Sequence, residues 1–414
     1  MGVSTAHFLQ THSIDVTVVE RESAPAEGAS YGNGGYLQSS VPDPWNAPGA
    51  FSMFVNAWSN YLTGRGDRSA FSVVTMAIPG LLSWGLEFLS NSDEKTFLNS
   101  LAINRDLAQY TKEVLGALSE SEQLNYSQSA KGSLVIFRDM ASMAAYETLV
   151  SKTESSGTKR TLLDPGQLIA TESSLASIAP ELVGAVHLTD DHSGNSHQYC
   201  QGLEAITRER GAQYYYNTQV QKICPVSQKI ELQLDAGKLM ADAVVVAAGV
   251  HSKPLVKPLG IRLPVVPAKG YSISIPMTHW EKRPKHVIVD MGIHAGLNPL
   301  GENLRVAGTA EFCGLRRGTS SKRIEYLIDL ARQILPDMQK IDIKDIDPWS
   351  GFRPLTTDGL PIIGETGVKN VYLITGHGGL GWTQGTGSAK ALADKIAGVQ
   401  SEFELEKYSL GRFR

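Results

Sequence analysis

The sequence has few residues of the kinds that build metal sites and disulfide frameworks. Only three cysteines occur among 414 residues, Cys200, Cys224 and Cys313, and no two of them form a C-x-x-C pair. Widely spaced cysteines in odd number indicate neither a disulfide framework nor a thiolate metal site, so a reducing compartment is expected. The ten histidines contain no H-x-x-x-H pair, which argues against a zinc hydrolase. We therefore expect a site without a metal ion.

A strong excess of one charge is also missing. The chain carries 38 Lys and Arg against 42 Asp and Glu, a formal net charge of -4. This balance offers no electrostatic case for nucleic-acid binding. No basic leader with an apolar core and a cleavage site precedes the first segment that looks folded, so we expect a cytoplasmic protein.

Long hydrophobic runs are absent as well. The most apolar stretch outside the predicted strands, residues 77–89, is interrupted by Pro79 and Glu87. It is shorter than the roughly 20 residues that span a bilayer. A buried helix or a domain contact is one explanation, because short apolar helices are usually buried. The other is a helix on a membrane surface, which would place the protein peripherally on the cytoplasmic face of the inner membrane.

The length of the chain predicts two domains. Residues 16–19 form a β-branched run typical of a parallel strand that is covered on both faces, and the same βαβ character returns in residues 197–249. Between them, residues 42–129 have a mostly helical pattern. Residues 263–306 alternate as in an antiparallel sheet. This interleaving predicts domains that are each assembled from discontinuous segments.

The first residues resemble part of a nucleotide-binding βαβ unit. Gly2 and Ala6 fit the last glycine and the small packing position of a helix that receives a pyrophosphate at its N-terminus. Glu20 follows at a predicted strand end, where an acidic side chain binds ribose hydroxyls. A helix and strand that merely end in glutamate explain the same residues, so this half-motif alone does not decide.

A second glycine cluster lies in residues 375–389, TGHGGLGWTQGTGSA, between a predicted strand and a predicted helix. Glycines allow close backbone approach, and free N–H groups at a helix N-terminus attract negative charge. Such a helix end suits a reduced flavin, which carries negative charge at N1 and O2. A phosphate site and a plain glycine-rich turn are the alternatives.

Longer motifs cover nearly the whole chain and thin out only between residues 50 and 100. The most specific are GFRPLTTDGLPIIGET and NVYLITGHGGLGWTQGTGSAKALAD, with ASYGNGG and ADAVVVAAGVHS in support. In these segments the chain resembles the D-amino-acid oxidase superfamily of FAD-dependent amine oxidoreductases, most closely the catalytic subunits of bacterial D-amino acid dehydrogenases.

The resemblance implies an α/β fold in which a Rossmann-like FAD-binding domain of the glutathione-reductase type is interleaved with an α+β substrate domain on an antiparallel sheet. The FAD-binding domain would comprise residues 1–45, 190–255 and 345–414. The substrate domain would comprise residues 46–189 and 256–344 and include the helical stretch 50–128.

The resemblance also assigns roles to single residues. Arg353 matches the family arginine that pairs with the substrate carboxylate, and a guanidinium suits two carboxylate oxygens. A structural ion pair, for example with Asp358, is the alternative. The FAD would be non-covalent, because no cysteine lies in or near the glycine loop. Its binding positions would be Gly2, Glu20, Arg21, Ser30, Asn33, Gly35, Val220, Gly249, Gly379, Leu380, Gly381, Trp382 and Thr383.

The chain departs from the family pattern in two places. The glycine and sarcosine oxidase branch often places a tyrosine near the substrate, and residues 290–299 contain none; Tyr271 and His294 are candidates for this catalytic role, although each also fits an ordinary sheet residue. The family's first strand and first two glycines would precede Met1. We expect Met1 to be an internal residue exposed by truncation or by a late-assigned start codon, with a short form of weakened flavin binding as the alternative.

The implied activity is oxidative deamination of a D-amino acid to a 2-oxo acid and ammonia, with hydride transfer from Cα to flavin N5. The implied electron acceptor is a quinone or the respiratory chain. A second possibility keeps the fold and changes the substrate to a secondary amine acid such as hydroxyproline, sarcosine or an opine. A third, motivated by the absent strand, is a flavin-poor binding subunit. No pattern in the sequence indicates which substrate side chain is preferred or how many copies of the protein associate.

Overall fold

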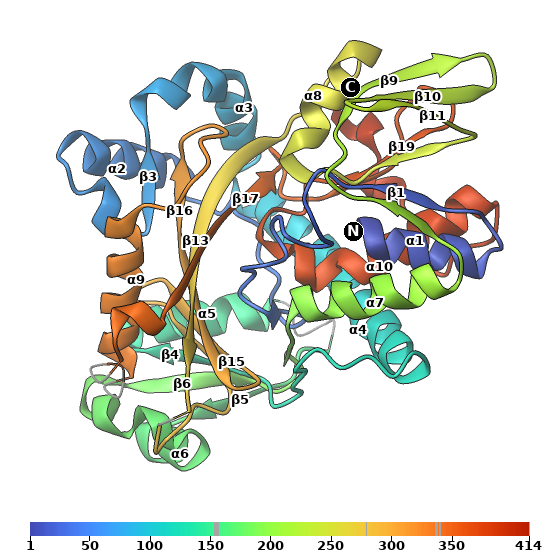
Figure 1. Cartoon of the computed structure of the whole chain (residues 1–414). Helices are drawn as coiled ribbons and strands as arrows, with labels where there is room; N and C mark the ends of the chain where they lie inside the picture. The colour runs from blue at the N-terminus through green and yellow to red at the C-terminus, as the bar shows by residue number, and fades with distance from the viewer. Residues whose placement is uncertain (153–156, 279, 336–337, 339–340, 414) are drawn as a thin grey trace.

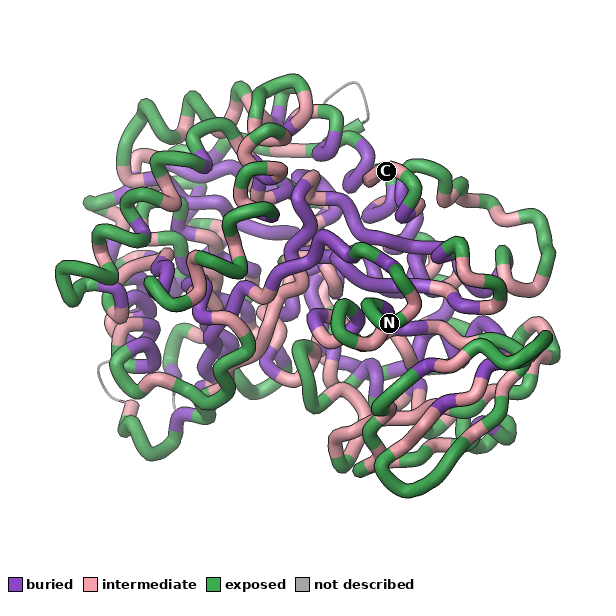
Figure 2. Tube along the Cα trace, turned by 90° about the horizontal axis from the view of Figure 1, so that it is seen from above, coloured by how far each residue is buried: buried purple, intermediate pink, exposed green. Residues whose placement is uncertain are grey.

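The chain folds around two sheets of different kinds, seen at the right and the left of Figure 1. The computed structural model describes residues 1–152, 157–278, 280–335, 338 and 341–413. Buried positions concentrate in the interior of the molecule, and the periphery is mostly exposed (Figure 2). No helix in these ranges is long and apolar enough to cross a membrane.

The first sheet is Rossmann-like and consists of two pieces. Its elements are β1 (Thr17–Val19), β8 (Gln213–Tyr215), β12 (Val244–Val246), β19 (Val371–Thr375) and β18 (Ile362–Glu365). β1 pairs in parallel with β8, and β12 pairs in parallel with β19, whose other edge holds β18 antiparallel. The predicted strands at residues 16–19, before Gly249 and before the glycine loop are therefore confirmed.

Three helices cover these strands: α1 (Gly2–Thr11), α7 (Ser196–Glu209) and α10 (Gly381–Ala397). Their small and apolar residues pack into one core with the second half of α4 (Glu94–Ser121), as Figure 1 shows for α1, α7 and α10. A three-stranded meander extends from this side of the molecule. It consists of β9 (Val220–Val226), β10 (Lys229–Leu234) and β11 (Gly237–Ala241).

The second sheet is large and mostly antiparallel. In spatial order its main path is β17 (Asp347–Leu355), β13 (Val266–Pro276), β16 (Asn303–Phe312), β15 (Ala295–Leu300), β14 (Val287–Asp290), β4 (Ser133–Phe137), β6 (Gly184–Leu188) and β5 (Arg160–Leu163). A ninth strand, β3 (Phe71–Val73), pairs in parallel with the end of β16. The alternating pattern of residues 263–306 is confirmed, since it forms β13 to β15 and the start of β16.

Helices cover both faces of this sheet. α9 (Ser321–Ile334) places Ile324, Leu327, Ile328 and Ala331 on one stripe, which packs against β13, β15 and β16. The opposite face near β13 and β17 is covered by α2 (Ala50–Leu62) and α3 (Ile78–Ser90). Three shorter helices complete the set, namely α5 (Met140–Ser151), α6 (Pro165–Thr171) and α8 (Ser252–Val256).

The two sheets share segments across the predicted domain boundaries. β17 begins at Asp347, inside the predicted FAD-binding range 345–414, yet it is an edge strand of the large sheet. α4 lies inside the predicted substrate range 46–189, yet it packs on α10. The physical reason is that an edge strand and a long helix each contact both cores. The exact boundaries stay a prediction.

Candidate active site

Arg353 lies near the end of β17, on the face of the large sheet that α2 and α3 cover. It pairs across the strands with Ala268 of β13. Its guanidinium lies over Gly270: a Cβ built on Gly270 would stand 2.2 Å from Nη1 and 2.5 Å from Cζ. Any other side chain at this position would displace the guanidinium, so the bare backbone of Gly270 is what leaves room for Arg353.

The contacts of Arg353 supply no countercharge. Nη1 donates to the carbonyl oxygen of Thr309 at 3.0 Å, and Cζ lies 5.6 Å from the ring centroid of Trp45. Among the described residues no carboxylate pairs with Arg353. The alternative partner, Asp358, instead accepts two hydrogen bonds from Arg412, at 2.6 and 3.2 Å.

This environment keeps Arg353 charged but poorly compensated. Loss of solvent around the partly buried guanidinium lowers its pKa to about 10, which leaves it protonated at neutral pH. A desolvated cation without an anionic partner is costly, and an anionic ligand would offset that cost. The arrangement therefore suits a carboxylate.

The glycine loop meets Arg353 from the other sheet. Leu355, two residues beyond Arg353, forms an isolated β-bridge with His377. A Cβ on Gly379 would lie 3.5 Å from Nε1 of Trp45, so the loop and the arginine share Trp45 as a neighbour. Burial lowers the pKa of His377 to about 3, and its Nε2 lies 3.1 Å from the Ser388 hydroxyl, so this histidine is neutral.

Thr309 is a site residue that the sequence does not reveal. Its φ of +58° is a genuine outlier for a β-branched residue. Such backbone strain costs of the order of 1–3 kcal/mol and persists where surrounding structure enforces it, often at functional sites. The buried Thr309 hydroxyl also has no hydrogen-bond partner within the described part of the chain. The sequence gives no signal of this conformation, because threonine is not a residue that favours a positive φ.

The two catalytic candidates other than Arg353 are not in contact with it. Tyr271 pairs with Ser350, one position along from Gly270 and Gly351, so its side chain lies on the opposite face of β13. There its hydroxyl donates to Glu311 at 2.7 Å, and the guanidinium of Arg323 lies 5.4 Å from its ring. The structure does not bring Tyr271 to the guanidinium of Arg353.

His294 lies on the same side as Arg353 but at a distance. It is exposed in the turn between β14 and β15, with a φ of +54°. Its ring centroid is 6.1 Å from that of Phe71, whose ring in turn lies 6.0 Å from Trp45. Among the described ring contacts, His294 is connected to Arg353 through Phe71 and Trp45.

The N-termini of two helices at the predicted cofactor site lack a side-chain cap. Neither α1 nor α10 has a side-chain cap among the described contacts. Uncapped N–H groups at the start of a helix favour negative charge. A Cβ on Gly2 would lie 3.9 Å from Ala247, so α1 begins beside the segment that follows β12. Gly249 in this segment has a φ of +54° and no atom within 4 Å of a would-be Cβ, which leaves open space at the strand end.

The loop of residues 30–35 joins the two sheets. The Asn33 side chain accepts from the Gly35 amide at 2.8 Å, and a Cβ on Gly35 would lie 2.7 Å from Nδ2 of Asn298. Nη1 of Arg305 in β16 donates to the carbonyl oxygens of Tyr31 and Asn33, at 3.1 and 2.8 Å. The carbonyl of Ser30 accepts from the Ser196 hydroxyl at 2.7 Å. These hydrogen bonds therefore fix the loop beside the place where the resemblance puts the flavin.

Glu20, Arg21 and Val220 lie where β1 and β9 meet their loops. Glu20 follows β1 directly, and its carboxylate accepts from the Glu22 amide at 3.0 Å. Nε of Arg21 donates to the Glu22 carboxylate at 2.9 Å. Val220 is the first residue of β9. Their backbone positions are consistent with a ribose and adenine pocket, whose individual contacts stay a prediction.

The residues at the start of α10 are mostly buried in the core. Leu380 is buried ahead of the helix, and Gly381 is its first residue. The Trp382 ring packs 5.8 Å from Tyr126 and 5.1 Å from Tyr199, inside the core of the first sheet. Only the backbone of this residue is thus left to face a ligand.

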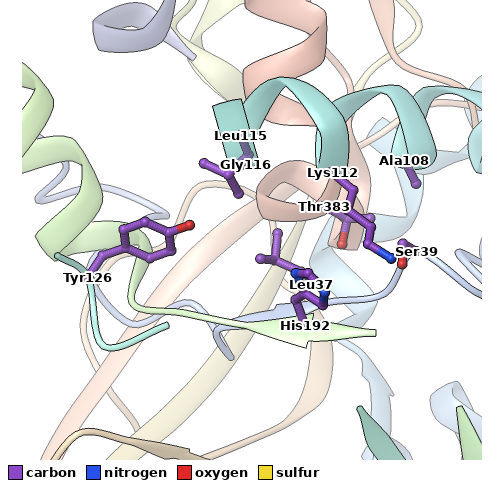
Figure 3. Close-up of a pocket in the computed structure, with 9 residues that line it drawn as sticks. All are labelled: Leu37, Ser39, Ala108, Lys112, Leu115, Gly116, Tyr126, His192 and Thr383. Atoms are coloured by element: carbon purple, nitrogen blue, oxygen red, sulfur yellow. The ribbon is translucent and has the colours of Figure 1, made fainter. Parts of the chain in front are cut away.

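Thr383 borders a small cavity between α10 and α4 (Figure 3). Its volume is about 40 Å³, and its polar lining includes Ser39, Lys112 and His192. Burial lowers the pKa of His192. A cavity of this size has room for only a few water molecules. It is therefore too small for an amino acid and lies apart from Arg353.

The comparisons with known proteins agree with this geometry. The family model described as "DAO: FAD dependent oxidoreductase" matches residues 1–395. The chain belongs to this family of FAD-dependent oxidoreductases. Proteins named D-amino acid dehydrogenase are similar over the whole length: one from Vibrio cholerae is 34% identical and covers 100% of the chain and 96% of the relative. One from Vibrio vulnificus is 32% identical and covers 97% and 95%. The family resemblance inferred from the motifs is confirmed.

Solved structures of DAO proteins share the fold at low identity. Glycine oxidase from Geobacillus kaustophilus superimposes with a TM-score of 0.72 at 20% identity, covering 99% of this chain and 95% of that one. L-proline dehydrogenase from P. horikoshii gives 0.74 at 15% identity, covering 99% and 94%. These comparisons confirm a Rossmann-like FAD-binding domain joined to a substrate domain.

The residues present fit the FAD on which the family depends. The uncapped N-terminus of α1 suits a pyrophosphate, and the uncapped N-terminus of α10 suits the negative edge of a reduced flavin. Open space beside Gly249 and the fixed position of the loop at Asn33 add to this fit. Of the residues described, no cluster of His, Cys, Asp and Glu could hold a metal ion. The protein is an FAD-dependent oxidoreductase.

Proposed function

We propose that this oxidoreductase oxidises a D-amino acid to the corresponding 2-oxo acid and ammonia. The observation that carries the proposal is Arg353, a partly desolvated cation with no carboxylate partner in the described structure, beside the loop that begins α10. The similar Vibrio proteins named D-amino acid dehydrogenase support the same substrate class.

In this proposal the chain contributes mainly orientation. Bound FAD supplies the acceptor for the hydride that leaves Cα. Arg353 binds the substrate carboxylate with charge-assisted hydrogen bonds, and its own bond to the Thr309 carbonyl limits its rotation. Trp45 and the aromatic residues of α2 and α3 exclude water from that side. Among the described contacts of Arg353 there is no base. In this proposal the amino proton therefore passes to solvent or to a group that does not touch Arg353.

An anaerobic titration tests the substrate class. We expect the purified protein to be yellow and its flavin absorption to bleach on addition of D-alanine, because the electrons have no other acceptor. A panel of D-proline, hydroxyproline and sarcosine serves as the comparison. Bleaching by the secondary amines alone would move the substrate to that class. A colourless protein that FAD cannot reconstitute would favour the binding subunit and refute the proposal.

We also propose that the electrons pass to a quinone, with the protein attached peripherally to the cytoplasmic face of the inner membrane. The support is an outer apolar face on α2 and α3. Phe51, Val55, Trp58 and Leu62 recur with helical spacing along α2 and are all exposed. Met76 just before α3, and Leu82 and Leu86 one turn apart on α3, are exposed as well. Soluble proteins rarely expose an apolar surface of this extent without a partner.

The opposite side of the same helices is buried. Phe54 of α2 packs against Phe88 of α3 and Phe312 of β16, with ring centroids 5.7 and 5.1 Å apart. The charged side chain of Glu87 is turned away from the outer face, because it accepts from Thr357 and Arg262. The exposed Arg65 follows α2, whereas Arg68 beyond it pairs with Asp329. An uncharged apolar face beside a cationic side chain matches an anionic lipid surface.

Vesicle flotation tests the attachment. We expect the wild type to float with vesicles that contain phosphatidylglycerol, and Leu82→Glu with Leu86→Glu to lower the bound fraction at least about tenfold, because each buried leucine contributes about 1.5–3 kcal/mol. Val399→Glu is the matched control, since Val399 is also half-exposed but lies after α10. Equal flotation of both variants would contradict the assignment of this face, and a wild type that stays unbound would contradict the attachment.

A further inference from the structure

Thr309 lies where β16 exchanges one neighbouring strand for another. Gly308 is the last β16 residue paired with β15, through Ala295, and Ala310 is the first paired with β3, through Phe71. On the other side, β13 pairs Tyr271 with Gly308 and Lys269 with Glu311. Two residues, Thr309 and Ala310, therefore lie opposite the single residue Gly270. This is a β-bulge, a feature that re-aims chain segments next to active sites.

The bulge acts directly on the arginine of the site. Gly270, opposite the bulge, is the residue over which the guanidinium of Arg353 lies. The carbonyl oxygen of Thr309 accepts from Nη1 of Arg353 at 3.0 Å. Because one donor of the guanidinium is held in this way, the orientation of its remaining donors is fixed.

The hydroxyl of Thr309 belongs to the same residue whose carbonyl oxygen holds the guanidinium. The carbonyl and hydroxyl oxygens of one threonine are separated by only about 3–5 Å in any rotamer, because few bonds join them. Thr309 is only 7% exposed, and its hydroxyl has no partner in the described structure. A buried hydroxyl is normally hydrogen-bonded, so one without a partner near an unpaired cation indicates a ligand.

We propose that Thr309 is a second carboxylate-binding residue, whose hydroxyl donates to the carboxylate that Arg353 holds. This inference rests on the proposed function. A guanidinium and a hydroxyl together can satisfy three lone pairs of one carboxylate, which fixes its tilt as well as its position. Thr309 thus selects for substrates that present a free carboxylate next to the reacting carbon.

Two substitutions separate the hydroxyl from the backbone. Thr309→Val keeps the shape and the β-branching, and so the strain, but removes the donor. Thr309→Ser keeps the donor. For the FAD-loaded enzyme we expect Thr309→Val to raise both the KM for D-alanine and the Kd for propionate about tenfold, with kcat within about twofold of wild type. Propionate binding is read from the shift of the flavin absorption, without turnover. Thr309→Ser is expected to retain wild-type values.

The outcomes distinguish this inference from the function on which it rests. Unchanged propionate binding in Thr309→Val, or an equal loss in Thr309→Ser, would overturn the role of the hydroxyl. A wild type that binds propionate through Thr309 but oxidises no D-amino acid would overturn the proposed reaction alone. If Thr309→Val does not fold, Thr309→Gly replaces it, because glycine adopts a positive φ without strain. We expect Thr309→Gly to melt no lower than wild type while it loses the same affinity; wild-type affinity in this variant would also overturn the inference.

Discussion

Replacing Arg353 with methionine is expected to raise the KM for D-alanine by about 100- to 20,000-fold, because two charge-assisted hydrogen bonds of about 1.5–3 kcal/mol each are lost. Flavin content should stay unchanged, since Arg353 contacts Thr309, Trp45 and Gly270 and none of the positions assigned to FAD. The melting temperature should not fall, because the substitution removes a desolvated charge that no described carboxylate compensates. Steady-state kinetics, the flavin spectrum and thermal unfolding check the three expectations.

Arg412 provides the matched control. It is another partly buried arginine in contact with the segment that follows Arg353, but it has a partner, because Nε and Nη2 donate to the Asp358 carboxylate. Arg412→Met should therefore lower the melting temperature and leave the KM within about threefold of wild type. It leaves the Asp358 carboxylate without its partner, whereas Arg353→Met removes a cation that has no carboxylate partner among the described residues. A KM that rises more in Arg412→Met than in Arg353→Met would show that the carboxylate is bound elsewhere.

The sequence was sufficient for the parts of the fold that short segments determine. The β-branched run at residues 16–19 and the apolar run before Gly249 are strands, because such residues favour a pleated, covered backbone in almost any context. The glycine loop is followed by α10 as predicted, since small residues let the helix pack closely against its neighbours. Arg353 could be singled out because its motif is long and continuous.

The residues that surround Arg353 could not be predicted in the same way. Trp45, Gly270 and Thr309 come from three distant segments. The register of β13 between β16 and β17 brings Gly270 and Thr309 to Arg353, and Trp45 comes from the loop before α2. Tyr271 shows how sensitive this is. A shift of one residue in a strand exchanges its faces, and the periodicity of β13 alone does not say which face meets the cofactor. The structure places Tyr271 beside Glu311 instead.

The apolar stretch at residues 77–89 shows a different limit. The sequence offered a buried helix and a membrane-surface helix as alternatives, and α3 has features of both. Phe88 is buried beside Phe54, whereas Leu86 is 72% exposed. A helix that is apolar on two sides has the same composition whether a given side is buried or exposed. Which side of α3 is buried therefore becomes known only from the packing of α2 on α3 and of both helices on the sheet.

Gly270 gives the sharpest test of whether this packing creates the site. Gly270→Ala would put a Cβ 2.2 Å from Nη1 of Arg353, at the far end of a flexible side chain. The guanidinium should therefore move while the sheet stays intact. We expect the KM for D-alanine to rise about 10- to 100-fold, because a misplaced group loses most of its orienting effect. Flavin content should be retained, and the fall in melting temperature should be small.

Gly296→Ala is the appropriate comparison, because Gly296 lies two strands away in β15 and a Cβ there would meet its nearest atom only at 3.8 Å. Both variants add one methyl group to the same sheet, so a difference in KM reports the position of Arg353 rather than a general effect of alanine in a strand. If Gly270→Ala also weakens propionate binding, by less than Arg353→Met does, the space above Gly270 holds the guanidinium that binds the carboxylate. Wild-type kinetics in Gly270→Ala would mean that Arg353 binds from a different position, and the geometry derived for the carboxylate would be wrong.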